Sequence, residues 1–599
     1  MLDESVVPTS VLVDVRQQLT ATLPTLPQIF RLGDRLAAAE PPASTPTQRI
    51  ATAGTVTIDY LTRAVACAVA AEGVFPLTYQ APFGSLVQEI LSPASALRDF
   101  APELIVLAPT WRDLIARLPI GATVADVDAA LAPTIALYRK LWSTLAASNI
   151  RIIQHTLVPP ANRYRGPAER LSPAAPANQV RRLNDALLDA GRGLVHFLDL
   201  EQIASEIGSR RWSASRFHYS AKLDFDPRWL PEYLAPFRAA WRAANARAKK
   251  VLALDLDNTL WGGVIGDDGV EGITLGPASA AGEAFEDWQR YVKGLAERGV
   301  VLGVCSKNAP EIAATGFTHA NSILKREDFA AFECSWTDKA GALRRVAKEL
   351  NLGLDSFVFA DDNPAECELV RQELPEVAVV HLGPDPAQFV ELFDAGCWFD
   401  LPAYTTEDLN RTAAYTGRAA ALAEATGAPD IDAYLAGLGM KGKLYRPEEA
   451  DIARVAQLEQ TTNQFNVTTR RYSEAAIRGF MARNDAIVLA FRLADRFGDH
   501  GLVSTLIALH EDDALRIDSW LMSCRVFSRS AEQYMLRGLI EQARGLGATR
   551  LIGEYRPTPK NEVVAELYQR LGFAPQETGF FVRQLGAEPD DLVSQIERA

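Results

Sequence analysis

Short apolar runs that end in polar or acidic residues alternate with amphipathic stretches through the middle of the chain. A short apolar run bounded by turn residues is typical of a buried strand, and apolar residues spaced three and four apart are typical of a helix. The expected strands are residues 251–254, 300–304, 322–324, 356–360 and 377–381. The expected helices include residues 284–298 and 339–350. Strands that alternate with helices predict a mostly parallel sheet, here over residues 246–400.

The flanking regions show related patterns, so the chain is predicted to be α/β with three units. Helical and proline-rich sequence fills residues 1–48, and a second α/β unit is expected over 49–245. Its expected strands are residues 55–58, 104–107, 152–156 and 194–197. After a helical connector at 401–426, a third unit with a helical tail is expected over 427–599. Its expected strands are residues 486–492, 502–509, 515–522, 550–554 and 580–584, with a helix at 562–571.

Composition narrows the functional classes. The net charge of −14 argues against broad binding to nucleic acid or an anionic membrane, although it leaves room for a local basic pocket. No apolar run reaches the roughly 18 residues of a membrane-spanning helix, and the first residues lack the basic start and apolar core of a secretion signal. The six cysteines are scattered without a CxxC pair, which indicates reduced thiols in a cytoplasmic protein rather than disulfides or zinc.

The first apolar strand of the middle region runs directly into two carboxylates. Asp255 and Asp257 follow residues 251–254, and Thr259 comes next. Ligands of open α/β sheets bind beyond the carboxyl ends of the strands, so these carboxylates are expected to line a site. Because two carboxylates this close repel each other, a hard cation such as Mg²⁺ is expected between them. The sequence therefore predicts metal-assisted chemistry on an oxyanion, most simply a phosphoryl group.

Later strand ends and helix starts supply matching chemistry. The side chains at these positions are Ser306, Lys307, Asn308, Lys339, Asp361 and Asp362. A hydroxyl at a strand end, beside a helix N-terminus, can hold a phosphate oxygen, and an ammonium there can neutralise phosphate charge. The last two carboxylates repeat the pattern of a strand that runs into acid. The sequence thus has four elements in order: the segment at residues 255–259, Ser306, Lys339, and the pair Asp361 and Asp362. A purely structural role as helix caps and turns would not explain all four.

In this order the four elements resemble the motifs of the haloacid dehalogenase (HAD) superfamily of phosphoryl-transfer enzymes. The string LDLDNTLWGGVIGDDG at residues 254–269 resembles the FkbH-like subfamily, also called subfamily IIIC. The resemblance implies a Rossmann-like domain with a minimal cap, in which Asp255 is the nucleophile and Asp257 protonates the leaving oxygen and then activates water. Ser306 and Lys339 would hold the phosphoryl oxygens. The further implied substrate ligands are Thr259, Lys307 and Asn308. The implied Mg²⁺ ligands are Asp255, the main-chain carbonyl of Asp257 and Asp361, with Asp362 close by.

The third unit carries polar segments of a different kind. Residues 522–530 follow an expected strand and open a helix, where free backbone N–H groups would cradle phosphate or pyrophosphate. These segments resemble the C-terminal part of FkbH-like proteins, which is similar to the GNAT acyltransferase fold. The loop of that fold reads RxxGxG; Arg525 matches it, but Ser528 and Ser530 stand at the glycine positions, which disfavours acetyl-CoA. Candidate ligands for glycerate or its phosphate, with a plain polar loop as the alternative, are Asn463, Asn466, Arg470 and Arg471.

FkbH-like proteins are associated with loading a glyceryl unit from 1,3-bisphosphoglycerate onto an acyl carrier protein in polyketide and related biosynthesis. The resemblance implies removal of the C3 phosphate and passage of the acyl group, through a cysteine thioester, to the phosphopantetheine thiol of a carrier acting in trans. Cys524 is favoured over Cys305 as that cysteine, because Arg525 and a helix N-terminus would help its thiol to ionise. His500 is the candidate base. For each cysteine alone, a buried core thiol is the alternative.

The N-terminal α/β unit resembles the SGNH-like domain that precedes the HAD domain in longer FkbH-like chains, which implies a flavodoxin-type sheet. An SGNH hydrolase needs a serine after the first strand, but residues 51–57 contain none. His218 stands where a late histidine falls, yet it cannot form a triad without that serine. The unit is therefore expected to be a non-catalytic structural or docking module. Two other functions stay open: a HAD phosphatase acting on another phosphorylated metabolite, and a carrier-docking scaffold with a vestigial HAD site.

Overall fold

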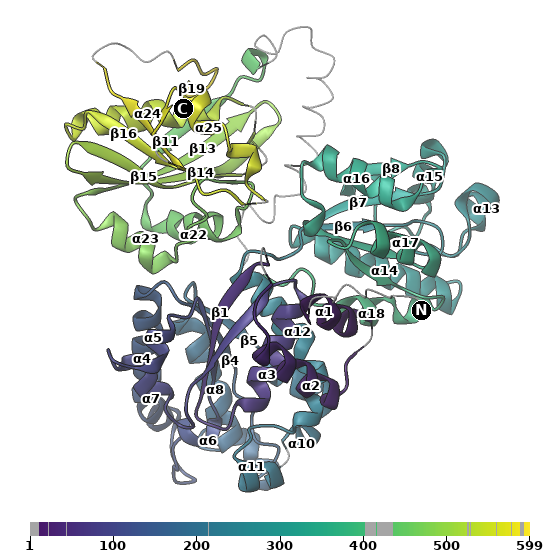
Figure 1. Ribbon diagram of the computed structural model, residues 1–599. Helices are drawn as coiled ribbons and strands as arrows, with labels where there is room; N and C mark the ends of the chain where they lie inside the picture. Colours follow the sequence, from purple (N-terminus) through teal and green to yellow (C-terminus); the bar gives the residue numbers. More distant parts are fainter. Residues whose placement is uncertain are drawn as a thin grey trace, which may run out of the picture. The chain divides into compact units, whose positions relative to one another are not determined.

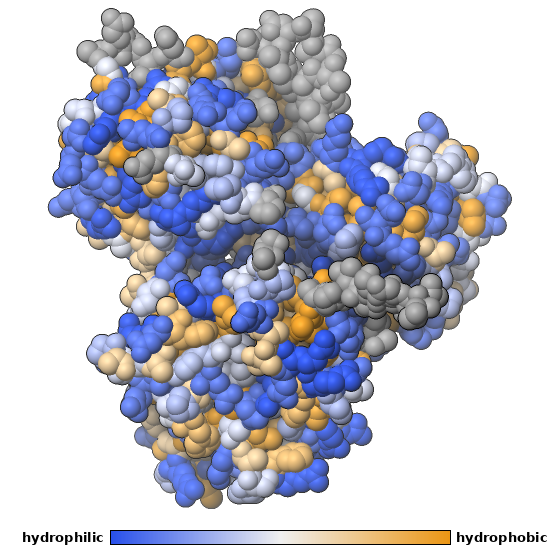
Figure 2. Space-filling model, viewed as in Figure 1, coloured by the Kyte–Doolittle hydropathy of each residue, from blue (hydrophilic) through white to orange (hydrophobic). Residues whose placement is uncertain are grey.

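The computed structural model divides the chain into two compact units, Met1–Asn245 and Ala246–Ala599. The structure describes residues 11–21, 23–42, 45–213, 215–401, 415, 435–523, 526–527, 529–558, 560–576, 578–586 and 592–599. No helix within these ranges combines the length and the apolar character that crossing a bilayer requires. Hydrophilic residues dominate the face drawn in Figure 2, interspersed with apolar ones.

The first unit is built on a parallel five-stranded sheet (Figure 1). Its strands are β1 (Thr47–Gly54), β2 (Phe75–Gln80), β3 (Leu104–Ala108), β4 (Arg151–His155) and β5 (Val195–Leu198). Their order, β2-β1-β3-β4-β5, is that of a flavodoxin-type sheet. The helices are α1 (Val11–Ala21), α2 (Leu26–Ala38), α3 (Asp59–Ala71), α4 (Leu86–Leu91), α5 (Ala96–Phe100), α6 (Trp111–Leu114), α7 (Val124–Ala147), α8 (Pro176–Ala190), α9 (Leu200–Ile207), α10 (Ser209–Trp212), α11 (Ser215–Ala221) and α12 (Leu230–Ala244).

The expected first strand at residues 55–58 is wrong, because β1 ends at Gly54 and those residues form the loop before α3. β1 is an inner strand, yet it is made largely of small and polar residues, so its hydrophobic pattern is weak. Close packing explains the small side chains: a Cβ on Gly54 would lie 2.8 Å from the carbonyl oxygen of Ala108 on β3. The strand is therefore specified by fit to its neighbours more than by apolar content.

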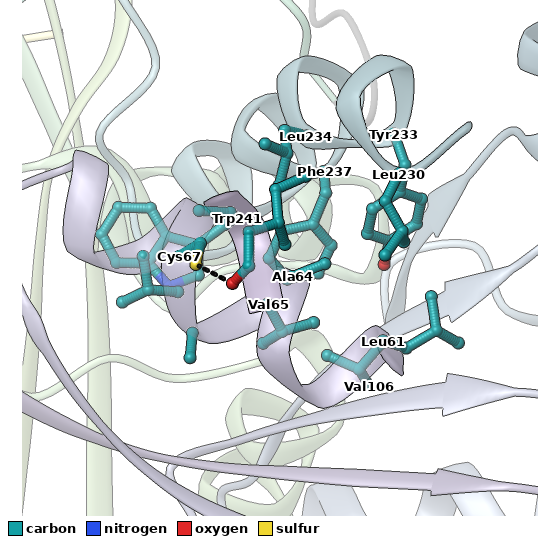
Figure 3. Close-up of a cluster of buried hydrophobic side chains, with 14 of the residues drawn as sticks. Leu61, Ala64, Val65, Cys67, Val106, Leu230, Tyr233, Leu234, Phe237 and Trp241 are labelled. Atoms are coloured by element: carbon teal, nitrogen blue, oxygen red, sulfur yellow. Dashed lines mark hydrogen bonds between the residues drawn. The ribbon is translucent and has the colours of Figure 1, made fainter. Parts of the chain in front are cut away.

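Helices cover both faces of this sheet. Successive residues of β3 alternate between two hydrophobic clusters, as the period of two in a strand requires. On one face α1, α2 and α12 pack around α3. Figure 3 shows this cluster, in which Tyr233, Phe237 and Trp241 of α12 lie against α3. The Sγ of Cys67 donates a hydrogen bond of 3.4 Å to the carbonyl of Ile29, so this cysteine is part of the core.

The second unit begins with another parallel sheet, in the order β10-β9-β6-β7-β8. Its strands are β6 (Val251–Leu254), β7 (Val301–Ser306), β8 (Phe329–Cys334), β9 (Phe357–Asp361) and β10 (Ala378–His381). Its helices are α13 (Ile265–Gly272), α14 (Ala280–Glu297), α15 (Pro310–Thr315), α16 (Lys339–Leu350), α17 (Pro364–Glu373) and α18 (Phe389–Asp394). Because the chain extends from β6 towards β8 and then crosses to β9, the topological switch point lies between β6 and β9.

The expected strand at residues 322–324 is wrong; the next strand is β8. The side chain of Gln289 on α14 binds this segment instead. Its Oε1 accepts hydrogen bonds from the backbone N–H groups of Ile323 at 2.9 Å and Leu324 at 3.0 Å. A side-chain amide therefore satisfies the backbone groups that a neighbouring strand would otherwise pair.

A mixed sheet completes the second unit, in the order β17-β18-β16-β15-β14-β13-β11-β19. Its strands are β11 (Lys441–Tyr445), β12 (Phe465–Asn466), which pairs with β15, β13 (Ala486–Asp495), β14 (Gly498–Glu511), β15 (Ala514–Met522), β16 (Arg550–Glu554), β17 (Ala574–Pro575), β18 (Phe580–Gln584) and β19 (Glu597–Arg598). Its helices are α22 (Ile452–Thr461), α23 (Glu474–Met481), α24 (Ala531–Gly545) and α25 (Leu567–Arg570). β15 and β16 run parallel, with α24 as their crossover. The predicted α/β class with three sheets is confirmed.

Two expectations for the ends of this unit have different outcomes. The helical tail is wrong for residues 592–599, where β19 instead pairs in parallel with β11. The packing of Ile596 in the core explains this, because an extended segment lets that single side chain enter the cluster beside β11. The expected connector at 401–426 lies outside the described residues, apart from residues 401 and 415.

Candidate active site

Three carboxylates meet at the switch point of the second sheet. Asp255 follows β6, Asp361 ends β9, and Asp362 comes next. Each offers one oxygen, and these oxygens lie within 4.8 Å of one another. Asp361 is fully buried, and the other two are half-buried. Strand pairing brings them together, since the N–H of Asp255 donates to the carbonyl of Ala360 at 3.1 Å.

One ammonium group serves this acidic cluster. Lys339 opens α16 and is 3% exposed. Its Nζ donates to Asp255 Oδ1 at 2.6 Å and to the carbonyl of Cys305 at 2.8 Å, and it lies 3.2 Å from Asp361 Oδ2. Burial by itself lowers the pKa of Lys339, but the charges of Asp255 and Asp361 outweigh it and raise that pKa. The lysine therefore stays protonated and neutralises part of the negative charge.

The remaining charge leaves room for a cation. Burial, followed by the charge of Asp255, raises the pKa of Asp361 to about 6, and the same two causes raise the pKa of Asp362. Asp361 Oδ2 is buried and accepts no hydrogen bond from any residue that the structure describes. The carboxylate oxygens of Asp255, Asp361 and Asp362 form the all-oxygen ligand set that hard divalent cations prefer. The residues present thus fit a divalent metal ion.

The segment after β6 is a tight turn with backbone hydrogen bonds. The carbonyl of Leu256 accepts from the N–H groups of Thr259 at 3.1 Å and Leu260 at 2.7 Å. Asn258 has a φ of +55°, a conformation that asparagine tolerates well, and its Oδ1 accepts from the N–H of Gly263 at 3.0 Å. This turn carries the chain from Asp255 to the second carboxylate.

Asp257 is fixed beside the cluster by three donors. Its Oδ1 accepts from Trp261 Nε1 and from the N–H of Ile265, both at 3.0 Å. Its Oδ2 accepts from Asn308 Nδ2 at 2.8 Å, and the same amide lies 3.1 Å from Ser306 Oγ. Ser306 and Asn308 are 3% and 4% exposed, so both are buried at the end of β7. This carboxylate is held in one orientation, which proton transfer to a bound substrate requires.

The other two predicted substrate ligands occupy different places. Thr259 is fully buried, and its Oγ1 donates to Asp362 Oδ1 at 3.2 Å, so it orients a carboxylate of the cluster. Lys307 is partly exposed and forms an ion pair with Glu366 on α17. Its ammonium group therefore belongs to the rim, not to the carboxylate cluster.

Trp336 is an exposed residue near Lys339 in the sequence, and the sequence patterns did not single it out as a site residue. It is 77% exposed, whereas the other nine tryptophans are buried or half-buried. Its loop is nevertheless rigid: Ser335 Oγ lies 2.9 Å from Thr337 Oγ1, and Arg345 donates to both hydroxyls. A pinned loop that presents an indole three residues before Lys339 suggests a contact for the substrate beyond its phosphate. The signal was a tryptophan in a short polar run directly before a site lysine.

The residues proposed for acyl transfer do not form one site among the described residues. Cys524 and Arg525 lie outside these residues. Cys305 is fully buried, and burial raises the pKa of its thiol. Its side chain packs in the hydrophobic cluster on one face of the sheet, while Ser306 faces the carboxylates. Cys305 is therefore a core thiol, which corrects its candidacy as the nucleophile.

His500 is 3% exposed and belongs to a buried ionic group. Its Nε2 lies 3.0 Å from Asp495 Oδ2 and 2.7 Å from an Nη of Arg529, which also pairs with Asp495. The Nε2 atom of the imidazole is thus engaged within the protein. Its role in this geometry is to link β14 to the last residue of β13 and to the segment just before α24.

The four substrate ligands predicted in the region of the mixed sheet likewise form hydrogen bonds within the protein. Asn466 is 1% exposed, and its Oδ1 accepts from the N–H of Thr469 at 2.8 Å. Arg470 donates to the carbonyl of Asp518 and to Glu554 Oε2, both at 2.8 Å. Arg471 and Asn463 form a hydrogen bond with each other, and both donate to nearby backbone carbonyls. In this geometry their polar groups hold the loop, and their assignment as substrate ligands stays a prediction.

Comparison with known proteins adds one informative likeness. No protein-family model and no curated protein matches the sequence. The ribosomal-protein-S18-alanine N-acetyltransferase from Escherichia coli is 16% identical over 25% of this chain and 99% of its own, with a TM-score of 0.20. A GNAT-family acetyltransferase from Streptococcus pneumoniae is 15% identical over 24% and 100%, with the same score. The N-terminal part of the protein BF1531 from Bacteroides fragilis, which contains a phosphatase domain complexed with Mg, is 26% identical over 64% of this chain and 100% of its own, with a TM-score of 0.56.

Proposed function

We propose that the second unit is a Mg²⁺-dependent phosphatase of the HAD type. The observation that carries this proposal is the cluster of Asp255, Asp361 and Asp362, with Lys339 bonded to Asp255. The Bacteroides fragilis fragment similar to this chain contains a phosphatase domain complexed with Mg, which supports both the reaction and the metal. Bound Mg²⁺ would mask the negative charges of the nucleophile and of the phosphoryl group.

The side chains divide the reaction between them. Asp255 attacks phosphorus, and the bond to the leaving oxygen breaks as an aspartyl phosphate forms. Asp257, oriented by Trp261 and Asn308, supplies the proton that the leaving oxygen takes up. A water molecule then gives that carboxylate a proton and attacks phosphorus, which releases phosphate and restores Asp255. The hydroxyl of Ser306 and the ammonium of Lys339 hold the phosphoryl oxygens.

The finer proposal is that this reaction serves glyceryl transfer. The substrate would be 1,3-bisphosphoglycerate, and the site would remove its C3 phosphate. The acyl group would leave the C1 phosphate for a thiol, with Cys524 as the candidate, and pass to the phosphopantetheine arm of an acyl carrier protein. The motif at residues 254–269 supports this reading through its resemblance to FkbH-like proteins.

A second candidate is a phosphatase that acts on another phosphorylated metabolite without acyl transfer. The observation that favours it is the engagement of His500, Arg470 and Asn466 within the protein, together with the burial of Cys305. A scaffold with a vestigial site is the weakest alternative, because the carboxylates, Ser306 and Lys339 are all in place.

The decisive experiment combines phosphate release with intact-mass analysis of a phosphopantetheinylated carrier. Enzyme, Mg²⁺ and 1,3-bisphosphoglycerate should release phosphate and add one glyceryl mass to the carrier. Cys524→Ala should abolish the mass shift, and Cys305→Ala serves as the matched control. Phosphate release without a mass shift would favour the simple phosphatase. Loss of neither activity on treatment with EDTA would overturn the metal-dependent mechanism.

A further inference from the structure

A pocket whose charge is opposite to that of the carboxylate cluster lies in the first unit. It has a volume of about 900 Å³. The connection that follows β4, the first half of α8, α9 and the start of α10 line it. All of these segments come after the carboxyl ends of β4 and β5, the side on which ligands of parallel α/β sheets bind. The pocket therefore lies on the carboxyl-end side of the sheet, and the proposed phosphatase residues belong to a different unit.

Arginine defines this pocket, which we call the arginine pocket. Its arginines are Arg163, Arg170, Arg181, Arg210 and Arg211. Arg181 lies 3.5 Å from Glu201, whereas the other four form no ion pair with any residue in the described ranges. Five guanidinium groups against the two carboxylates of Glu169 and Glu201 leave the pocket with a net positive charge, in a chain of net charge −14. Guanidinium forks match phosphate oxygens two at a time, so the pocket suits a phosphorylated ligand.

Glu169 adds a second feature to the arginine pocket. It is 6% exposed and lines the pocket. Its Oε2 accepts from the N–H of Arg165 at 2.9 Å, but its Oε1 is buried and accepts nothing from the described residues. A buried acceptor without a donor costs free energy, which a hydroxyl or N–H group of a ligand would offset. The carboxylate would repel a bare anion, so it favours an anion that also carries hydrogen-bond donors.

We infer that the arginine pocket binds a phosphorylated organic compound with hydroxyl or N–H groups, of about nucleotide size. A volume of about 900 Å³ falls within the range of small-molecule sites. Four guanidinium groups would hold the phosphates, and Glu169 Oε1 would accept from the organic part. This role goes beyond phosphoryl hydrolysis and gives the first unit a ligand of its own.

Isothermal titration of the full-length protein in EDTA tests the inference, with ADP, inorganic pyrophosphate and adenosine as probes. ADP should bind, and raising the salt from 50 to 200 mM should weaken it severalfold because phosphate contacts are ionic. Arg210→Glu with Arg211→Glu, and separately Arg163→Glu with Arg170→Glu, should weaken ADP at least tenfold. Arg192→Glu, which removes an exposed arginine that is paired with Asp189 and does not line the pocket, should change nothing.

Glu169→Gln separates the two halves of the pocket. Loss of its charge should tighten pyrophosphate and reduce the preference for ADP over pyrophosphate severalfold. Unchanged ADP affinity in both double variants, or no ADP heat at millimolar concentration, overturns the inference. Binding of an acidic protein without ADP binding would also overturn it. Both double variants should hydrolyse p-nitrophenyl phosphate normally with Mg²⁺ and melt at the wild-type temperature, so a failure here is distinguishable from failure of the phosphatase proposal.

Discussion

The two parallel sheets use the same edge for opposite charges. Beyond the carboxyl ends of β6 and β9, three carboxylates gather around one lysine, and the arrangement suits a cation. Beyond the ends of β4 and β5, five arginines line one pocket together with Glu169 and Glu201, and the arrangement suits an anion. Both sheets have five parallel strands. The carboxyl-end side of a parallel sheet therefore offers places for a ligand, and the residues after the strands decide which charge suits it.

The largest expected effect is loss of activity at the carboxylate cluster while the arginine pocket keeps its ligand binding. Asp255→Asn should lower phosphate release by at least about a thousandfold, because it removes the nucleophile. ADP binding in the arginine pocket should stay within about twofold of wild type, since the two sites do not share residues. Phosphate release by a malachite green assay and titration calorimetry check the two halves. Activity of the variant near that of an Asp189→Asn surface control would remove Asp255 from its role.

Lys339→Met should have the next largest effect. Loss of an ammonium that holds the phosphoryl group should lower turnover by roughly a hundredfold or more. The variant also leaves Asp255 and Asp361 without their cation, so the metal-free protein should lose about 3 kcal/mol of stability. Thermal unfolding with and without Mg²⁺ measures this, and Mg²⁺ should raise the melting temperature more in the variant. Equal Mg²⁺ effects would mean that the lysine and the metal do not share these carboxylates.

Trp336→Ala should affect binding more than chemistry. Loss of the exposed indole should raise KM roughly tenfold and leave kcat within about threefold, as expected for a contact outside the reacting group. Trp336→Phe should recover most of the KM, since it keeps an aromatic face. Steady-state kinetics on the best substrate gives both values. Exposed Ile312 on α15 supplies a control, and equal effects of Ile312→Ala and Trp336→Ala would make the indole an ordinary surface residue.

A buried acid in the mixed sheet predicts the smallest effect, a pH dependence of the stability of the folded protein. Glu459 accepts hydrogen bonds from the hydroxyls of Thr505 and Ser519, whereas the carboxylates of the second sheet contact a lysine. Burial raises the pKa of Glu459 to about 8, although hydrogen bonds from Ser519 and Thr505 act to lower it. The folded protein then keeps a proton that the unfolded chain releases above its ordinary value of 4.5. Stability should therefore fall as the pH rises from about 5 to 8.

Glu459→Gln should remove the part of that slope between about pH 6 and 8, above the pKa of about 6 of Asp361, with a difference on the order of a few kcal/mol between its ends. Urea unfolding at several pH values between 5 and 8.5 measures it. Glu541→Gln, at an exposed position on α24, is the control and should keep the wild-type slope. A slope that survives above about pH 6 in Glu459→Gln would mean that this carboxyl is already ionised in the fold.

Local patterns predicted some elements fully and others not at all. The strand at 251–254, the helix at 339–350 and the strand at 580–584 have the bounds that the structure gives. β1 was misplaced because its small residues follow from close packing against β3, which has no local signature. Residues 322–324 look like a strand, but one amide on α14 takes their hydrogen bonds. A contact made by a distant side chain cannot be read from the segment itself.

The candidate site divides in the same way. That acids follow β6 and β9 is visible in the sequence, since an apolar run predicts a strand and the next residue its end. That the two strands are neighbours is a property of the sheet order. Arg470 and His500 show the opposite case: the sequence predicts a substrate ligand and a base, and only the structure shows that they pair with Glu554 and Asp495. Polar residues near a turn serve ligand and protein equally well until the surroundings are specified.

By itself, the sequence determined the α/β class, the acidic ends of β6 and β9, and the hydroxyl and ammonium groups that follow in order, because period and strand ends are local properties. Only the tertiary structure decided that Lys339 bonds Asp255, that Cys305 is a core thiol, and that arginines from three segments share one pocket. These depend on contacts between residues far apart in the chain. Such contacts follow from strand order and packing, which no single segment encodes.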